Sequence, residues 1–228
     1  MDKKNNVLIV APHADDEILG CGGIISRYSK NGDNVYIVIV TNANIGAPDL
    51  FSIDDINRVR NEAIEAHQLL KVTRTFFLEF PAPRLETYPS YEISNALAKI
   101  IYENSIDTMF IPHKGDIHRD HTVVYYSCLV AARPINNCPV KKILSYETLS
   151  ETEWSSPDAG NVFIPNVFID ITQFLSDKLR AMSCFSSQVK DAPHPRSLDI
   201  IENLAKSRGS TINCGYAEAF MLIRSIIK

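Results

Sequence analysis

The sequence lacks a basic surface signature. Its 228 residues include 23 Lys and Arg against 27 Asp and Glu, a formal net charge of -4, and no cluster of Lys or Arg stands anywhere along the chain. Proteins that bind nucleic acids through phosphate contacts normally carry a basic stripe. The composition therefore predicts no nucleic-acid partner.

Long hydrophobic runs and cysteine motifs are also lacking. The apolar run that begins at Val7 is interrupted by Pro12-His13-Ala14-Asp15-Asp16, which makes it too short and too acidic for a signal peptide or a spanning helix. The five cysteines are widely spaced and form no Cys-x-x-Cys pair, so they fit neither a disulfide framework nor a thiolate zinc site. We expect a cytoplasmic protein with no membrane partner.

Short apolar runs alternate with amphipathic segments along the chain. Near-continuous β-branched and apolar runs predict buried parallel strands, and apolar residues at three- and four-residue steps predict helices between them. The expected strands cover residues 7–10, 35–40, 75–78, 108–111, 143–146 and 167–170, and the expected helices cover residues 17–30, 54–70, 90–104, 119–132, 176–185 and 197–208. This order predicts an α/β fold: a Rossmann-like open, mostly parallel sheet with helices on both faces. No repeat or composition break divides the chain, so we expect a single domain.

A histidine and three acids follow the first expected strand directly: His13, Asp15, Asp16 and Glu17. The start of a helix favours one or two acids through its free N–H groups and its dipole. Three adjacent carboxylates repel one another, and a histidine three residues before Asp16 suggests a cation that removes this repulsion. Nitrogen and oxygen ligands together suit zinc.

The glycines in the first expected helix raise the alternative of a dinucleotide site. Gly20-Cys21-Gly22-Gly23 lies too late and does not spell G-x-G-x-x-G, and the second expected strand ends in Thr41-Asn42 without an acid for a ribose. The dinucleotide interpretation is therefore weak, and close packing of the first helix on the sheet explains the glycines better.

A second cluster follows the fourth expected strand. His113, His118 and His121, with Asp116 and Asp120, fall within nine residues of a chain that has six histidines in all. Such a group can supply a metal ligand, a proton-transfer group and an orienting carboxylate. In the common strand order 3-2-1-4, the first and fourth strands are neighbours at the switch point. The two clusters are therefore expected to form one site.

These motifs resemble those of the LmbE/PIG-L family of zinc-dependent N-acetylglucosaminyl deacetylases. The first motif stands here as Pro12-His13-Ala14-Asp15-Asp16-Glu17, with Ala14 where Pro is usual, and the second as Asp116-Ile117-His118-Arg119-Asp120-His121. Weaker similarity covers Arg60-Asn61-Glu62-Ala63 and Ala217-Glu218-Ala219-Phe220. The resemblance implies that residues 1–228 form a single deacetylase domain. Its implied reaction removes an N-acetyl group from an N-acetylglucosamine-type conjugate, giving acetate and a free amine.

The resemblance also implies roles for individual residues. One Zn²⁺ per chain is held by His13, Asp16 and His121, although iron or cobalt stays open as the metal. Asp15 is the general base, a protonated His118 shares the charge of the oxyanion with the metal, and Asp120 orients His118. Spacing alone does not decide which of Asp15 and Asp16 is the base. Arg60 and His194 are candidates for substrate binding, each with the alternative of an ordinary surface residue.

Two other functions stay open at this point. A metal-dependent phosphoesterase also uses His and Asp clusters at strand ends, often with two ions, and a non-catalytic sugar-binding domain is the third candidate. The expected partner is a small-molecule amino sugar, with Asn42, Asn44 and Arg84 available for hydroxyls or an anionic aglycone. Trp154 is expected to pack at the core or the rim, or to stack on a sugar ring. The sequence leaves open whether the chain forms a homo-oligomer.

Overall fold

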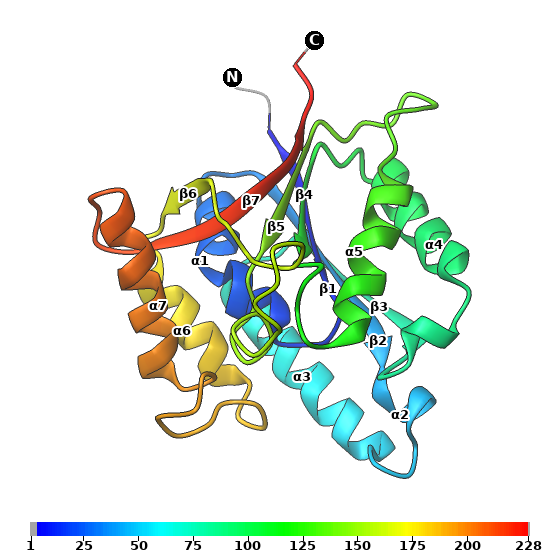
Figure 1. The fold of residues 1–228 in the computed structure, drawn as a ribbon, viewed down its shortest axis with the longest axis horizontal. Helices are drawn as coiled ribbons and strands as arrows, with labels where there is room; N and C mark the ends of the chain where they lie inside the picture. Colours follow the sequence, from blue (N-terminus) through cyan, green and yellow to red (C-terminus); the bar gives the residue numbers. More distant parts are fainter. Residues whose placement is uncertain (1–3, 228) are drawn as a thin grey trace.

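The computed structural model describes residues 4–227 and contains a seven-stranded sheet with the order β3-β2-β1-β4-β5-β7-β6 (Figure 1). The strands are β1 (Asn6–Ala11), β2 (Asn34–Asn42), β3 (Arg74–Pro81), β4 (Thr108–Pro112), β5 (Lys142–Tyr146), β6 (Val167–Asp170) and β7 (Ala217–Ser225). Neighbours among β1–β5 pair in parallel, whereas β7 is antiparallel to both β5 and β6. The expected mostly parallel α/β sheet is confirmed.

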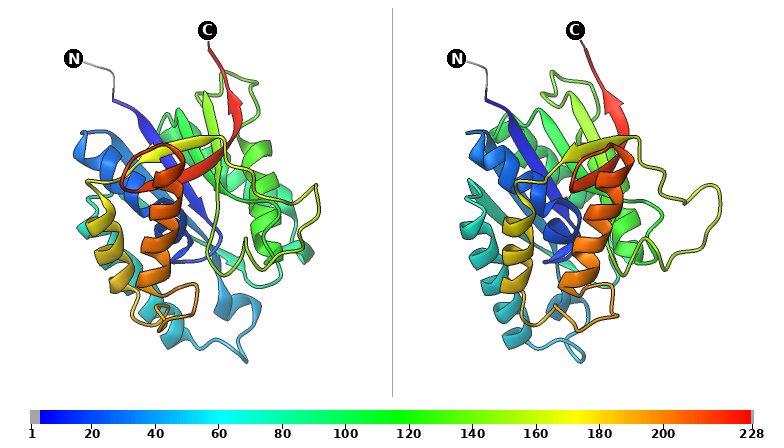
Figure 2. Two further views of the ribbon diagram at one scale, coloured as in Figure 1. Left: turned by 60° about the vertical axis from the view of Figure 1, so that its left-hand side comes forward. Right: turned by 90° about the vertical axis from the view of Figure 1, so that its left-hand side faces the viewer.

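Helices cover both faces of this sheet (Figure 2). They are α1 (Asp16–Lys30), α2 (Ala43–Gly46), α3 (Ile53–Leu69), α4 (Ser90–Glu103), α5 (Arg119–Ala131), α6 (Leu175–Cys184) and α7 (Leu198–Thr211), with a 3-10 turn η1 (Leu85–Thr87). One face carries α1, α3, α6 and α7, which contribute to one buried apolar cluster. The opposite face carries α4 and α5, which contribute to a second cluster.

Strand β1 shows why its sequence is continuously apolar. Val7 and Ile9 point into the cluster beneath α1, while Leu8 and Val10 point into the cluster beneath α4 and α5. Successive side chains of a strand face opposite sides of the sheet, so a strand covered by helices on both sides needs an apolar residue at every position.

The expected strands and helices are present within a few residues of their bounds, with three additions. The sequence analysis missed α2, η1 and the whole of β7. It interpreted residues 217–220 only as a family motif, because Glu218 interrupts the apolar pattern there. In the fold this segment is an interior strand, and Glu218 is buried against α1 and α6.

The carboxylate of Glu218 forms a buried polar junction with α1 and α6. It accepts hydrogen bonds from the N–H groups of Gly23 and Ile24, both at 2.8 Å, and from Lys178 Nζ at 2.6 Å. Lys178 also donates to the carbonyl of Leu19 at 2.8 Å. Neither charge is exposed, so each depends on the other to offset its loss of hydration.

We therefore predict that Lys178→Met lowers the free energy of unfolding by about 3–5 kcal/mol, because it leaves the Glu218 carboxylate buried without its counter-charge. Urea denaturation at neutral pH measures this. Lys99→Met is the matched control, since Lys99 is exposed and lies 3.9 Å from Glu103, and it should change stability little. Equal stabilities of the two variants would contradict the role of the buried pair.

Candidate functional site

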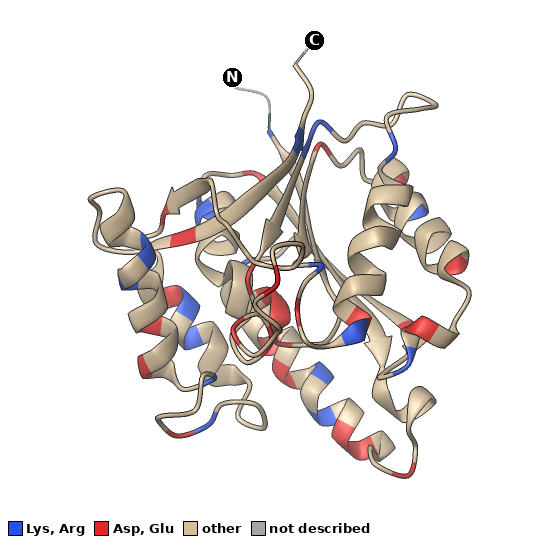
Figure 3. Cartoon of the chain, viewed as in Figure 1, with Lys and Arg blue, Asp and Glu red and all other residues tan. Residues whose placement is uncertain are grey.

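The two sequence clusters meet at the carboxyl edge of the sheet. β1 and β4 are adjacent parallel strands, so the residues after β1 lie beside those after β4. The chain after β1 turns into α1 at Asp15, and the chain after β4 turns into α5 at His118. Figure 3 shows acidic segments where α1 begins and at the start of α3. The predicted convergence of the clusters is confirmed.

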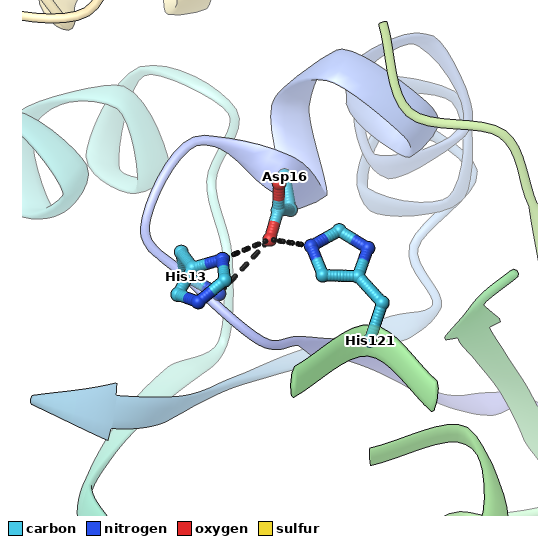
Figure 4. A group of neighbouring side chains, drawn as sticks. All are labelled: His13, Asp16 and His121. Atoms are coloured by element: carbon cyan, nitrogen blue, oxygen red, sulfur yellow. Dashed lines mark hydrogen bonds and ion pairs between the residues drawn. The ribbon is translucent and has the colours of Figure 1, made fainter. Parts of the chain in front are cut away.

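His13, Asp16 and His121 form a tight triad (Figure 4). Oδ2 of Asp16 lies 3.3 Å from Nδ1 of His13 and 3.3 Å from Nε2 of His121. One potential ligand atom from each residue falls within 4.8 Å of the others, a spacing that could hold a metal ion. Burial disfavours the charged form of Asp16, but His121 and His13 outweigh it and hold the pKa of this carboxyl well below its usual range.

The ring of His121 provides a test of whether a cation fits. Its Nδ1 donates to Oδ2 of Asp116 at 2.7 Å, whereas its Nε2 is buried and makes no hydrogen bond to any residue in the range 4–227. Buried polar atoms are normally satisfied. Nε2 of His121 faces Oδ2 of Asp16 and the ring of His13, so its lone pair is placed to bind a cation between the three residues. A set of two nitrogen ligands and one oxygen ligand suits zinc.

A second carboxylate stands behind each histidine of the triad. Asp116 holds His121, and Oδ2 of Asp120 lies 3.2 Å from Nε2 of His13. Asp120 is itself fixed, because its Oδ1 accepts the N–H of Leu85 at 2.9 Å. A hydrogen bond to the far nitrogen of a ligating histidine fixes its tautomer and ring orientation.

The expected pairing of the Asp120 carboxylate with His118 is corrected by this geometry. Oδ2 of Asp120 lies 4.0 Å from Nδ1 of His118, beyond hydrogen-bond distance, and is closer to His13. Instead, the backbone N–H of Asp120 donates to Nδ1 of His118 at 3.2 Å, as in a helix N-cap. The neutral ring of His118 therefore carries its proton on Nε2.

The surroundings of His118 also affect its charge. Burial and the neighbouring His13 lower the pKa of His118 to about 4. The lowered pKa favours the neutral imidazole in this arrangement, and the protonated ring that the resemblance implies stays a prediction. Because Nε2 keeps its hydrogen, the side chain still provides an N–H donor on the wall of the site.

Asp15 is held in a strained backbone conformation. Its φ is 114°, a value that residues with a side chain rarely adopt. The N–H of Asp15 donates to Oε2 of Glu17 at 3.1 Å. The other oxygen of Glu17, Oε1, pairs with Nε2 of His67 at 3.0 Å. Nδ1 of His67 in turn lies 2.9 Å from Oγ1 of Thr75. The chain of contacts from Thr75 to Asp15 fixes the turn that presents the Asp15 carboxylate. Glu17 lies in the motif, whereas no pattern in the sequence singles out His67.

Arg196 is the main site residue that sequence reasoning missed. Its Nη1 donates to Oδ2 of Asp15 at 3.0 Å, and its Nε donates to Oγ of Ser150 at 2.8 Å. Burial raises the pKa of Asp15 to about 7, and Arg196 opposes that rise. Asp15 is only 2% exposed, so the guanidinium stabilises a carboxylate that is otherwise removed from water.

A cavity of about 490 Å³ opens beside the triad. Its walls include His13, Asp15, His118 and Arg196, and it also includes Arg60 as the sequence suggested. Nη2 of Arg60 donates to Oε1 of Glu79 at 2.8 Å. The guanidinium thus lies on the wall of the cavity and is already paired.

The other suggested substrate contacts lie elsewhere. His194 is not among the described residues that line the cavity; its Nδ1 accepts the N–H of Arg196 at 3.1 Å, and its ring meets that of Trp154 edge to face. Trp154 is exposed, so it does not pack in the core, and it is not among the described residues that line the cavity. Asn42 and Asn44 are already hydrogen-bonded: Asn42 caps α2 and donates to Oε2 of Glu79 at 2.5 Å, and Asn44 donates to the carbonyl of Phe51 at 2.8 Å. Short polar side chains at a strand end satisfy nearby backbone groups first.

The fold and the site define a doubly wound α/β protein that carries its polar chemistry at the carboxyl edge of a parallel sheet. A family model described as PIG-L, GlcNAc-PI de-N-acetylase, matches residues 8–132. The uncharacterized deacetylase YaiS of Escherichia coli is 31% identical over 188 residues, which cover 79% of this chain and 90% of that protein. The chain belongs to the PIG-L family, as its motifs suggested.

Solved structures share the fold at lower sequence identity. The N,N'-diacetylchitobiose deacetylase of Pyrococcus horikoshii superposes with a TM-score of 0.75 and 23% identity, covering 96% of this chain and 84% of that one. GalB, the 4-carboxy-2-hydroxymuconate hydratase of Pseudomonas putida, superposes with a TM-score of 0.75 and 17% identity, covering 98% of both chains. Because a deacetylase and a hydratase share this fold, the fold alone does not identify the reaction.

Asp116→Asn is expected to weaken binding of zinc by about 10–100-fold, because it replaces the carboxylate that orients His121. Competition with a chromophoric chelator measures the affinity. Asp199→Asn, at an exposed position in the first turn of α7, is the matched control and should bind as the wild type does. Unchanged affinity in a folded Asp116→Asn variant would contradict the orienting role.

Proposed function

We propose that this chain is a metal-dependent N-deacetylase that removes the acetyl group from an N-acetylglucosamine-type amino sugar, and that residues 1–228 act as a single domain. The observation that carries this proposal is the meeting of the His13–Asp16–His121 triad, the ionisable Asp15 and the N–H donor of His118 at one cavity. Amide hydrolysis needs an activated water, a base and a donor for the developing oxyanion. Family membership supports the same reaction.

The donor set fits one zinc ion per chain, held by His13, Asp16 and His121. A second group of potential ligands, His13, His118 and Asp120, shares His13 with the first. Two ions would need a single imidazole to bridge them, whereas two-metal hydrolases hold ions about 3.5–4 Å apart to clamp both oxygens of a displacement. The shared histidine therefore favours one ion and disfavours the two-metal phosphoesterase.

The residues around the triad have separate tasks in this reaction. A bound zinc ion supplies Lewis acidity and lowers the pKa of a water molecule beside it. The carboxylate of Asp15 accepts a proton from the attacking water, and Arg196 fixes the position of that carboxylate. Nε2–H of His118 donates to the acetamide oxygen as negative charge develops there. The proton held by Asp15 passes to the amine nitrogen when the C–N bond breaks, so that acetate and a free amine leave.

The substrate class rests on the family and on the shape of the cavity. The diacetylchitobiose deacetylase of the comparison acts on an N-acetylated sugar by its own name, and we infer a small-molecule amino sugar for this chain. Arg60 lies where it can contact a sugar or acetate oxygen once its partner Glu79 is displaced. Among residues 4–227 no helix is long and apolar enough to cross a membrane.

Asp15→Asn and Asp16→Asn should separate the two neighbouring carboxylates. We expect Asp15→Asn to keep one zinc ion per chain and to lose about 10²–10⁴-fold in kcat, because it removes the base but no ligand. Asp16→Asn should lose the metal. Elemental analysis and acetate release are measured on the same preparations. Loss of zinc from Asp15→Asn with retention in Asp16→Asn would show that the two roles are exchanged.

The substrate class is tested by comparing kcat/KM for water-soluble N-acetylglucosamine conjugates, N-acetylated peptides and N-acetylglucosaminyl lipids in vesicles. We expect the soluble sugar conjugates to have the highest value, because the chain that carries the cavity is similar to deacetylases of small N-acetylated sugars. Faster turnover of the acetylated peptide would contradict the sugar assignment. Cleavage of a phosphodiester at a comparable rate would favour the phosphoesterase.

A further inference from the structure

The cavity beside the triad has one apolar wall. Away from His13 and Asp15, it is lined by Ile39 of β2, Ile56 and Val59 of α3, Leu50 and Phe51 of the segment between α2 and α3, and Pro83. The charges at this end are paired with one another: Arg58 donates to Asp55 at 2.6 Å, and Arg60 donates to Glu79. The free surface offered to a ligand here is therefore mainly hydrocarbon.

The same segment exposes large apolar side chains at the cavity mouth. Leu50 is 77% exposed and Phe51 is 39% exposed, although both line the cavity. Ile45 and Ile53 are exposed beside them. Single exposed apolar residues are ordinary, but Leu50 and Phe51 are adjacent, exposed and part of the cavity wall, which marks this edge as a site for an apolar ligand.

The segment that carries Leu50 and Phe51 is fixed in place. A Cβ atom at Gly46 would lie 1.7 Å from the carbonyl oxygen of Ala82, so only glycine allows this approach to the residues after β3. Nδ2 of Asn44 holds the carbonyl of Phe51, and Ser52 with Asp55 forms a capping box at the start of α3. The apolar wall is thus a preformed surface, which binds a ligand at low entropic cost.

Resting on the deacetylase function proposed above, we propose that this wall is a subsite for an alkyl or aryl aglycone of the amino sugar. The acetamide has to reach the buried triad, so the sugar ring occupies the polar part of the cavity. The aglycone is attached to the ring carbon next to the one that bears the acetamide, so it lies in the same cavity as the acetamide and can contact the wall that includes Leu50 and Phe51. The cavity has a volume of about 490 Å³, which accommodates a ligand larger than an acetamide group and a single sugar ring. This proposal is an alternative to the anionic aglycone that the sequence analysis considered.

The test compares the methyl and hexyl glycosides of N-acetylglucosamine, which differ only in the apolar group. We expect the wild type to prefer the hexyl glycoside by about tenfold in kcat/KM, the gain from burying roughly two methylene groups. In the double variant Leu50→Ser/Phe51→Ser this ratio should fall toward one. Ile53→Ser is the matched control: Ile53 is 65% exposed in the same segment but is not among the described residues lining the cavity, and the ratio should stay as in the wild type.

Three outcomes would overturn the proposal. The wild type could show no preference for the hexyl glycoside, or the double variant could keep it. A preference for N-hexanoylglucosamine over N-acetylglucosamine that depends on Leu50 and Phe51 would assign the wall to an acyl chain instead.

A binding measurement separates this proposal from the deacetylase function. Hexyl and methyl glucoside lack the acetamide and are titrated calorimetrically into the wild type and the double variant. Tighter binding of the hexyl compound by the wild type alone supports the subsite, even if no acetate is released from any substrate. Equal binding of both compounds by the wild type refutes the subsite, even if acetate release proves the deacetylase function.

Discussion

The constraint on which this structure depends is the burial of three consecutive carboxylates where β1 ends. Asp15, Asp16 and Glu17 are all withdrawn from water, where like charges repel strongly and hydration is lost. Each carboxylate has a different partner: Arg196 for Asp15, the His13–His121 pair for Asp16 and His67 for Glu17. Apart from His13, which belongs to the motif itself, these partners come from α3, from α5 and from the segment before α7, so the packing of distant elements is tied to one short motif.

The same arrangement explains how three identical charges have different roles. Asp16 sits between two imidazoles, which keep it ionised and available to a cation. Asp15 has a guanidinium and the cavity beside it, so its carboxylate can exchange a proton with a ligand. Glu17 points inward to His67 and holds the backbone of Asp15. Neighbours along the chain thus differ in function because the turn directs them to different surroundings, which spacing in the sequence does not reveal.

The sequence predicted the parts of the fold that depend on local patterns. The apolar strands, the amphipathic helices, the strand order around β1 and the meeting of the two histidine-rich clusters follow from periodicity and topology, and all are present. Contacts between side chains that are brought together only by tertiary packing could not be predicted from these local patterns. The sequence analysis chose His194 and missed Arg196, because the sequence of a loop with two prolines does not predict which of its side chains points into the site. It missed β7 because Glu218 is stabilised by Lys178 only in the folded chain.

The position of β7 has a consequence for how the chain is made. This strand pairs between β5 and β6, although it follows every other strand in the sequence. Until the ribosome has released it, the edge of β5 offers unpaired backbone groups, and Glu218 is absent from the core beneath α1. Arg196 also follows β1 by more than 180 residues, so Asp15 lacks its counter-charge until that later segment has been made. A nascent chain of this topology therefore stays open at one sheet edge until residues 217–225 have been added.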